Sequence, residues 1–176
     1  IGGNHVLHTM RRNVDIKMVM FNNRIYGLTK GQASPTSEFG KHTKSSPEGT
    51  IDQPIVPLSV ALSAEATFVA RTVDWNPAHL YQTLVTASRN KGTSFVHILQ
   101  RCPTYTPDIF EELRRDPDRT LLLTHADGVP LDEAAAKPYK NRLEHDPRDL
   151  AAARQLAGGG GERMAIGLLY RNPDAP

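Results

Sequence analysis

The chain has 176 residues, a length that fits one domain or one domain with a small appendage. Its 21 lysines and arginines against 19 aspartates and glutamates leave a formal net charge of +2, which gives no basis for binding nucleic acid or an acidic membrane surface. No apolar run is long enough to span a membrane, and a single cysteine excludes an internal disulfide framework and favours a reducing compartment, the cytoplasm.

The first predicted elements are a helix and a strand. Apolar residues at helical spacing predict a helix over residues 5–12. Residues 14–21 first alternate between apolar and polar and then form a continuous apolar run. This pattern predicts a strand that becomes buried on both faces. The strand ends at Asn22-Asn23. Because the chain runs from Ile1 straight into this helix, we expect it to be a fragment whose upstream part is missing.

A long connection and two further strand-containing units follow. Residues 31–57 are rich in Gly, Ser, Thr and Pro, and their apolar residues follow neither the helical nor the strand spacing. We therefore expect a functional loop. A helix is predicted over 58–66 and a strand over 67–73. Asn76 and the proline after it predict the start of a helix that ends near residue 90. Residues 93–100 are predicted to form another buried strand.

The order of strands and helices predicts an α/β fold with a mostly parallel sheet flanked by helices. We divide the chain into a domain over 1–103 and a C-terminal extension over 104–176. In the extension the pattern weakens: it predicts a helix over 107–115, a strand over 120–124 and a helix over 149–157. A flexible break at 158–161 follows, and His145 is expected at the polar surface.

Two candidate sites follow strands of the predicted sheet, since ligands bind beyond the carboxyl ends of parallel strands. Asn22-Asn23 follows one strand and Cys102 another. Taken alone, the asparagine pair is most simply a turn, and a lone cysteine is most simply a small buried residue. The apolar Ile25-Tyr26-Gly27 after the pair is unusual for a surface turn, and amide and carbonyl oxygens suit Mg²⁺.

The stretch from Asn22 to Ser37, NNRIYGLTKGQASPTS, closely resembles the thiamine-diphosphate motif of the beta subunits of 2-oxoacid:ferredoxin oxidoreductases. Within that family it is most similar to the 2-oxoglutarate enzymes. The resemblance extends through residues 1–5, 44–47 and 64–71. It is specific up to about residue 103 and loose beyond.

The resemblance implies a cofactor site and a metal site. Asn23 and the backbone carbonyl of Ile25 would be ligands of the Mg²⁺ that binds the diphosphate, and Tyr26, Gly27 and Leu28 would contact the cofactor. The family motif also has a Gly-Asp-Gly half, which supplies a further metal ligand. That half is absent from this chain.

The same resemblance assigns roles to Cys102 and Lys30. Cys102 would be one of four cysteine ligands of a 4Fe-4S cluster, whose three companions are not in this chain. Lys30 would pair with a substrate carboxylate, the alternative being an ordinary solvated loop cation.

By resemblance, the whole enzyme converts a 2-oxoacid and coenzyme A to an acyl-CoA and CO₂ and passes electrons to ferredoxin. Its cofactor lies at an interface with an alpha subunit, so we expect this chain to be inactive alone. Two alternatives stay open. Another thiamine-diphosphate enzyme, a decarboxylase or an acetolactate-synthase-like protein, would keep Asn23 without needing Cys102, and a non-catalytic α/β binding domain would use Asn22-Asn23 as a turn.

Overall fold

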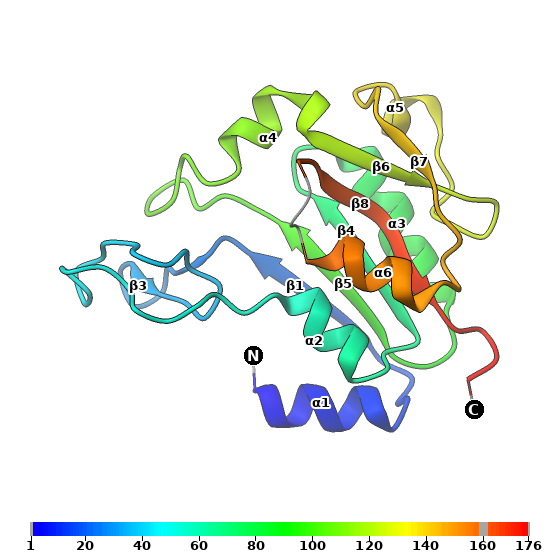
Figure 1. Cartoon of the computed structure of the whole chain (residues 1–176), viewed down its shortest axis with the longest axis horizontal. Helices are drawn as coiled ribbons and strands as arrows, with labels where there is room; N and C mark the ends of the chain where they lie inside the picture. Colours follow the sequence, from blue (N-terminus) through cyan, green and yellow to red (C-terminus); the bar gives the residue numbers. More distant parts are fainter. Residues whose placement is uncertain (1, 159–161, 176) are drawn as a thin grey trace.

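A computed structural model describes residues 2–158 and 162–175 of the chain (Figure 1). The strands are β1 Lys17–Asn22, β2 Ile25–Tyr26, β3 Gln32–Ala33, β4 Phe68–Val73, β5 Ser94–Leu99, β6 Thr120–Thr124, β7 Arg142–Glu144 and β8 Met164–Arg171. The helices are α1 Gly3–Arg11, α2 Pro57–Ser63, α3 Pro77–Arg89, α4 Glu111–Arg115, α5 Glu133–Ala136 and α6 Leu150–Ala157, with a 3₁₀ turn η1 at Pro117–Arg119. No helix among the described residues has the length and apolar character to cross a membrane.

Six strands form the main sheet in the order β1-β5-β4-β8-β6-β7. β1, β5 and β4 are parallel to one another, and so are β8, β6 and β7. The two halves meet at the antiparallel pair of β4 and β8. The predicted α/β fold with a mostly parallel sheet is therefore confirmed, with one reversal of direction in the middle.

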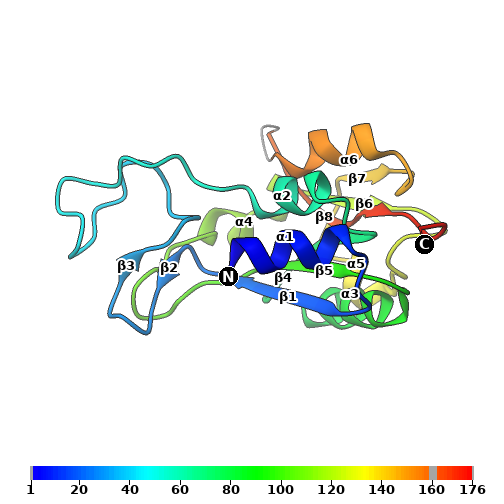
Figure 2. The same ribbon diagram turned by 90° about the horizontal axis from the view of Figure 1, so that it is seen from below.

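Helices cover both faces of this sheet (Figure 2). On one face, α1, α2 and α6 pack through side chains such as Met10, Leu58 and Ala153 against β4, β5 and β8. On the other face, α3 packs through Leu80, Leu84 and Ala87 against the alternate residues of β4 and β5. All residues of β4 and β5 are consequently buried, which confirms the predicted buried strand over 93–100. The strand predicted over 67–73 is also present.

The prediction that the strand over 14–21 is buried on both faces is wrong. β1 is an edge strand of the sheet, and Val19 and Phe21 on one of its faces are 40% and 61% exposed. Only the opposite face, with Met18 and Met20, packs against the core. A continuous apolar run does not distinguish a central strand from an edge strand, since both carry apolar residues on each face.

The segment after residue 103 adds β6, β7 and β8 to the sheet (Figure 1). The predicted strand over 120–124 and the predicted helix over 149–157 are confirmed. The helix predicted over 107–115 is shorter, because Phe110 has a left-handed backbone with φ of 59° and the helix begins only after it. The predicted break at 158–161 lies largely outside the described residues.

His145 is not at the surface as predicted. Its side chain is buried, and its Nε2 lies 2.7 Å from the carbonyl oxygen of Leu169 in β8. A polar sequence around a residue does not show which side chains turn inward, and a buried imidazole needs only such a partner to be accommodated.

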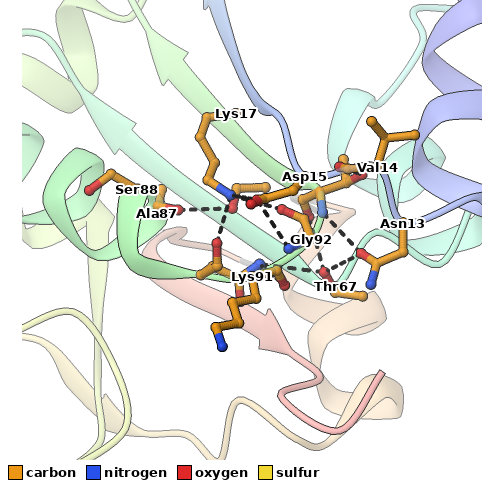
Figure 3. Close-up of polar contacts among 12 residues, drawn as sticks. Asn13, Val14, Asp15, Lys17, Thr67, Ala87, Ser88, Lys91 and Gly92 are labelled. Carbon is orange, nitrogen blue, oxygen red and sulfur yellow. Dashed lines mark hydrogen bonds and ion pairs between the residues drawn. The ribbon is translucent and has the colours of Figure 1, made fainter. Parts of the chain in front are cut away.

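At the amino ends of the strands, a polar network joins the turn before β5 to the turn before β1 (Figure 3). Lys17 Nζ donates to the carbonyl oxygens of Asn90 and Gly92 at 2.6 and 2.9 Å and pairs with Asp15. Asn13 Oδ1 accepts from the Thr93 N–H and from Thr67 Oγ1, both at 2.9 Å. This network fixes the start of β1 beside β5, so that both strands end at the same edge of the sheet.

Candidate active site

Asn22, the last residue of β1, has a buried side chain in which every polar atom is engaged. Its Oδ1 accepts from Thr36 Oγ1 at 2.7 Å and from the backbone N–H of Arg24 at 3.1 Å. Its Nδ2 lies 3.0 Å from His97 Nε2 on β5. Asn22 therefore does not point outward as a ligand, but ties the loop after β1 to the neighbouring strand and to the Ser-Pro-Thr segment.

Asn23 and Ile25 lie in the turn that Asn22 supports. Arg24 between them has φ of 53°, a left-handed conformation that is uncommon for a residue with a side chain. The Ser37 hydroxyl donates to the Arg24 carbonyl oxygen at 2.6 Å, and the Arg24 guanidinium pairs with Glu38. Contacts from both sides thus hold the turn in one conformation.

A cavity of about 390 Å³ opens beside this turn. Its volume falls within the range of about 300–1,000 Å³ that is usual for small-molecule sites. Asn22, Asn23, Ile25 and Tyr26 line one part of it. The rest of the lining comes from α1, β1, the 34–36 segment and the start of α2, and includes Gly3, Val6, Met10, Val19, Met20, Phe21, Arg24, Ser34, Pro35, Thr36, Ile55, Pro57, Val60 and Phe95.

The residues after Tyr26 form an arm that extends away from the sheet, as both views show (Figures 1 and 2). Leu28 is 99% exposed and Lys30 is exposed. The Gly31 backbone N–H donates to the Tyr26 carbonyl oxygen at 3.0 Å, closing a tight turn around Gly27. Asn23, Ile25 and Tyr26 are therefore brought together at the cavity, whereas Gly27, Leu28 and Lys30 lie beyond its lining.

Cys102 lies in a tight turn after β5, next to the Asn23 turn. The Thr106 N–H donates to the Cys102 carbonyl oxygen at 3.0 Å, and the Cys102 N–H donates to Thr106 Oγ1 at 3.3 Å. The same Thr106 hydroxyl donates to the Asn23 carbonyl oxygen at 3.0 Å. One threonine thus connects the cysteine turn to the asparagine turn.

The thiol of Cys102 lies close to backbone N–H groups of the turn that follows it. The backbone N–H of Tyr105 lowers the pKa of the Cys102 thiol below its ordinary value; partial burial opposes this shift, and the N–H groups of Thr104 and Thr106 add smaller lowering contributions. Backbone N–H groups that favour the thiolate also suit a thiolate that ligates a metal cluster.

Behind the asparagine turn, a buried cation and a buried imidazole lie side by side on β4 and β5. Arg71 and His97 are register partners, and both are nearly fully buried. Burial lowers the pKa of His97 to about 3, assisted by the charges of Arg71 and Arg24. Burial also lowers the pKa of Arg71 to about 10, which still leaves it charged at neutral pH.

The described residues fit a magnesium site only in part. The Asn23 Oδ1 accepts from the Ile25 N–H at 3.3 Å, and an amide oxygen has a second lone pair that a cation can use. Among residues 2–158 and 162–175, no group of three or more His, Cys, Asp or Glu side chains could hold a metal ion. Asn23 and the Ile25 carbonyl therefore suit a Mg²⁺ whose other ligands, such as phosphate oxygens, come from outside this chain.

Comparison with known proteins identifies the family. The family described as "Thiamine pyrophosphate enzyme, C-terminal TPP binding domain" matches residues 1–98. The chain belongs to the thiamine pyrophosphate enzymes, among the beta subunits of the 2-oxoacid:ferredoxin oxidoreductases. The resemblance seen in the sequence of residues 22–37 is confirmed.

Two relatives illustrate this similarity. The chain is 47% identical over 131 residues to the 2-oxoglutarate oxidoreductase subunit KorB of Mycobacterium tuberculosis, which covers 73% of this chain and 35% of that protein. It is 33% identical over 180 residues to the 2-oxoacid:ferredoxin oxidoreductase subunit beta of Saccharolobus solfataricus, covering 98% and 53%.

Among solved structures, the chain is similar to the 2-oxoglutarate:ferredoxin oxidoreductase of Magnetococcus marinus, described with 2-oxoglutarate, coenzyme A and succinyl-CoA bound. The TM-score is 0.79 at 32% identity, over 99% of this chain and 53% of that one. The matched part of the chain spans between about a third and about half of the length of these relatives.

Sequence reasoning missed three residues that hold the asparagine turn through hydrogen bonds to Asn22 or Asn23. They are Thr36, His97 and Thr106. His97 lies within a predicted buried strand, where a lone polar residue in an apolar run signals a need for a hydrogen-bond partner. For Thr36 and Thr106 the sequence carries no comparable signal, because threonines in loops usually bond locally.

Proposed function

We propose that this chain carries the thiamine-diphosphate and magnesium site of the beta subunit of a 2-oxoglutarate:ferredoxin oxidoreductase. The complete enzyme would convert a 2-oxoacid and coenzyme A to an acyl-CoA and CO₂ and transfer two electrons to ferredoxin. The observation that carries this proposal is the Thr106 hydrogen bond to Asn23, which links the turn with a magnesium-type oxygen donor to the turn with a thiolate.

The cofactor would occupy the cavity beside Asn23. Asn23 Oδ1 and the Ile25 carbonyl oxygen would bind Mg²⁺, and Tyr26 would contact the cofactor from the cavity lining. Gly27 and Leu28, which lie beyond that lining, would contact the part of the cofactor that extends out of the cavity toward the arm. Thiamine diphosphate, when bound, supplies an electron sink for decarboxylation. The apolar lining from α1 and β1 would exclude water from the thiazolium end.

Electrons would leave through a 4Fe-4S cluster to which Cys102 gives one thiolate. The chain has one cysteine, so the other ligands must come from elsewhere in the protein. The lowered pKa of the Cys102 thiol supports this role, because a thiolate is the ligating form. A 4Fe-4S site also fits a reducing compartment such as the cytoplasm.

An alpha subunit would complete the active site and bind against the arm that begins at Tyr26. The exposed Leu28 and Ile51, which are 99% and 85% exposed, give this arm apolar contacts suited to a partner surface. The remaining partners would be ferredoxin, coenzyme A and the 2-oxoacid. This arrangement predicts negligible turnover without the alpha subunit.

The experiment compares Asn23→Ala and Cys102→Ser in the assembled enzyme, purified without oxygen. Asn23→Ala should weaken Mg²⁺-dependent binding of thiamine diphosphate at least about tenfold and leave the cluster absorbance near 400 nm intact. Cys102→Ser should remove or shift that absorbance while cofactor binding persists. An enzyme whose cofactor affinity is unchanged by Asn23→Ala, or whose cluster is unchanged by Cys102→Ser, would refute the corresponding role.

Lys30 is proposed to recognise the second carboxylate of a dicarboxylic 2-oxoacid. Its ammonium makes no ion pair among the residues described, and its backbone has φ of 68° in the tight turn of the arm. Replacing Lys30 by Met should raise KM for 2-oxoglutarate about tenfold while KM for pyruvate changes little, since only the former has the second carboxylate. Lys41→Met, a change to another lysine of the arm, is the control. Equal effects of Lys30→Met on the two substrates would contradict the assignment.

A further inference from the structure

We propose that His97 is a positioning residue: its imidazole holds the Asn22 amide in one orientation, and this amide holds the turn that presents Asn23 and Ile25. His97 lies on β5, one strand away from the turn, and does not line the cavity. The inference rests on the proposed function, because it concerns how the two magnesium ligands are placed.

The hydrogen bonds of Asn22 determine which way its amide faces. Its oxygen must face the backbone N–H of Arg24 and the Thr36 hydroxyl, because the Arg24 N–H can only donate. Its NH₂ group then faces His97 Nε2 at 3.0 Å. An amide NH₂ has no acceptor lone pair to offer, so Nε2 must accept and the imidazole proton must be on Nδ1.

The oxygen end of the same amide supports an unusual backbone conformation. Arg24 has φ of 53°, and the hydrogen bond from its N–H to Asn22 Oδ1 helps to keep the chain in this left-handed turn. Rotation of the amide would bring its NH₂ group against the Arg24 N–H and remove that support. The Asn23 side chain and the Ile25 carbonyl would then lose their fixed placement.

Arg71 keeps His97 suited to this task. Its guanidinium donates to the carbonyl oxygens of Ala157 and Ala165 at 2.9 and 3.1 Å, and no carboxylate pairs with it in the described part of the chain. Because the cation lies beside the imidazole on the adjacent strand, protonation of His97 is disfavoured. A neutral imidazole retains the lone pair that the Asn22 NH₂ group requires.

The test uses substitutions of two buried histidines in the assembled enzyme. His97→Phe removes the acceptor, and His97→Gln restores one, since a glutamine oxygen reaches about as far as imidazole Nε2. The control is His79→Phe: His79 is also fully buried, but lies on α3 at the opposite face of the sheet and contacts Thr72. Mg²⁺ affinity at saturating thiamine diphosphate is measured by calorimetry, and folding by circular dichroism.

His97→Phe should weaken Mg²⁺ binding at least about tenfold, as is usual when a residue that orients a ligand is lost. His97→Gln should recover most of the affinity, and His79→Phe should match the unchanged enzyme. If His97→Phe binds Mg²⁺ normally, or if His79→Phe weakens binding equally, the inference is overturned.

A second measurement separates this inference from the proposed function. In the cofactor-free protein labelled with ¹⁵N-histidine, NMR should show that Nε2 of His97 is unprotonated and that Nδ1 carries the proton. The Asn22→Leu variant should no longer show this tautomer alone. A protonated Nε2 would overturn the inference. Failure of the unchanged protein to bind Mg²⁺ and thiamine diphosphate would instead refute the proposed function, and the tautomer would still decide the Asn22–His97 contact.

Discussion

Single residues set the geometry of the turns at both ends of the sheet. At the carboxyl end, Asn22 supports the left-handed backbone of Arg24. At the amino end, Asn13 receives the Thr93 N–H and the Thr67 hydroxyl. In each case one short amide side chain satisfies backbone groups that would otherwise be buried without a partner, which costs about 1–3 kcal/mol per group. These two asparagines add side-chain contacts at either end of the parallel ladder that pairs β1 with β5.

Gly92 offers a test of the amino-end network (Figure 3). Its φ is +95°, and a Cβ built there would lie 2.1 Å from Asn13 Oδ1. We expect Gly92→Ala to destabilise the protein by at least about 2 kcal/mol, because the strained backbone and the displaced Asn13 act together. Urea unfolding of the purified protein measures the change. Gly3→Ala, in the first turn of α1 with nothing within 4 Å of its Cβ, is the control and should be nearly neutral.

At the scale of elements, the sequence predicts best where a local signal and the packing agree. The helix α3 begins as expected at Asn76, whose side chain accepts from the His79 N–H at 3.1 Å. The sequence predicts β4 and β5 because short runs of mainly apolar residues are typical of strands between covering helices. The sequence predicts no strand where the short β7 lies, since the residues of β7 are all exposed and are held by pairing with β6 rather than by burial.

The candidate site was predictable to a smaller extent than the fold. The Asn23 turn and Cys102 carry motifs that can be recognised in the sequence. Their connection through Thr106 and the support from His97 depend on pairs of residues more than 70 positions apart, 83 and 75 respectively. No local pattern encodes such contacts, because they arise only when the strand order brings β1 beside β5.

The N-cap of α6 tests whether a locally encoded element has its expected strength. The Asp149 carboxylate accepts from the Ala152 N–H at 3.0 Å at the start of this helix. Asp149→Ala should lower the free energy of unfolding by about 1 kcal/mol, while Asp149→Asn, which keeps an acceptor oxygen, should lower it by no more than a few tenths. Chemical denaturation measures both. Equal losses for the two variants would show that the cap is not the source of the stability.

At the scale of the whole molecule, the two faces of the sheet each bury a neutral histidine. Side chains alternate along β5, so His97 lies on the same face as Phe95, the face that α1, α2 and α6 cover. His79 lies on α3, where its Nδ1 is 2.8 Å from Thr72 Oγ1. Neither imidazole has a carboxylate partner in the described ranges 2–158 and 162–175. Protonation of either imidazole would place a charge in the core. Proton binding to either histidine therefore destabilises the folded protein relative to the unfolded chain.

This destabilisation predicts acid lability with a defined sign. Burial lowers the pKa of His79 from 6.5 to about 4, so between these pH values the unfolded chain binds more protons than the folded one. Stability is therefore full above about pH 6.5 and falls as the pH decreases toward 4, by up to about 1.4 kcal/mol per pH unit for each such histidine. His79→Asn, whose side chain can still bond Thr72 but does not titrate, should flatten part of this slope. Parallel pH profiles of unfolding free energy for the two proteins would show that His79 is already charged in the folded state.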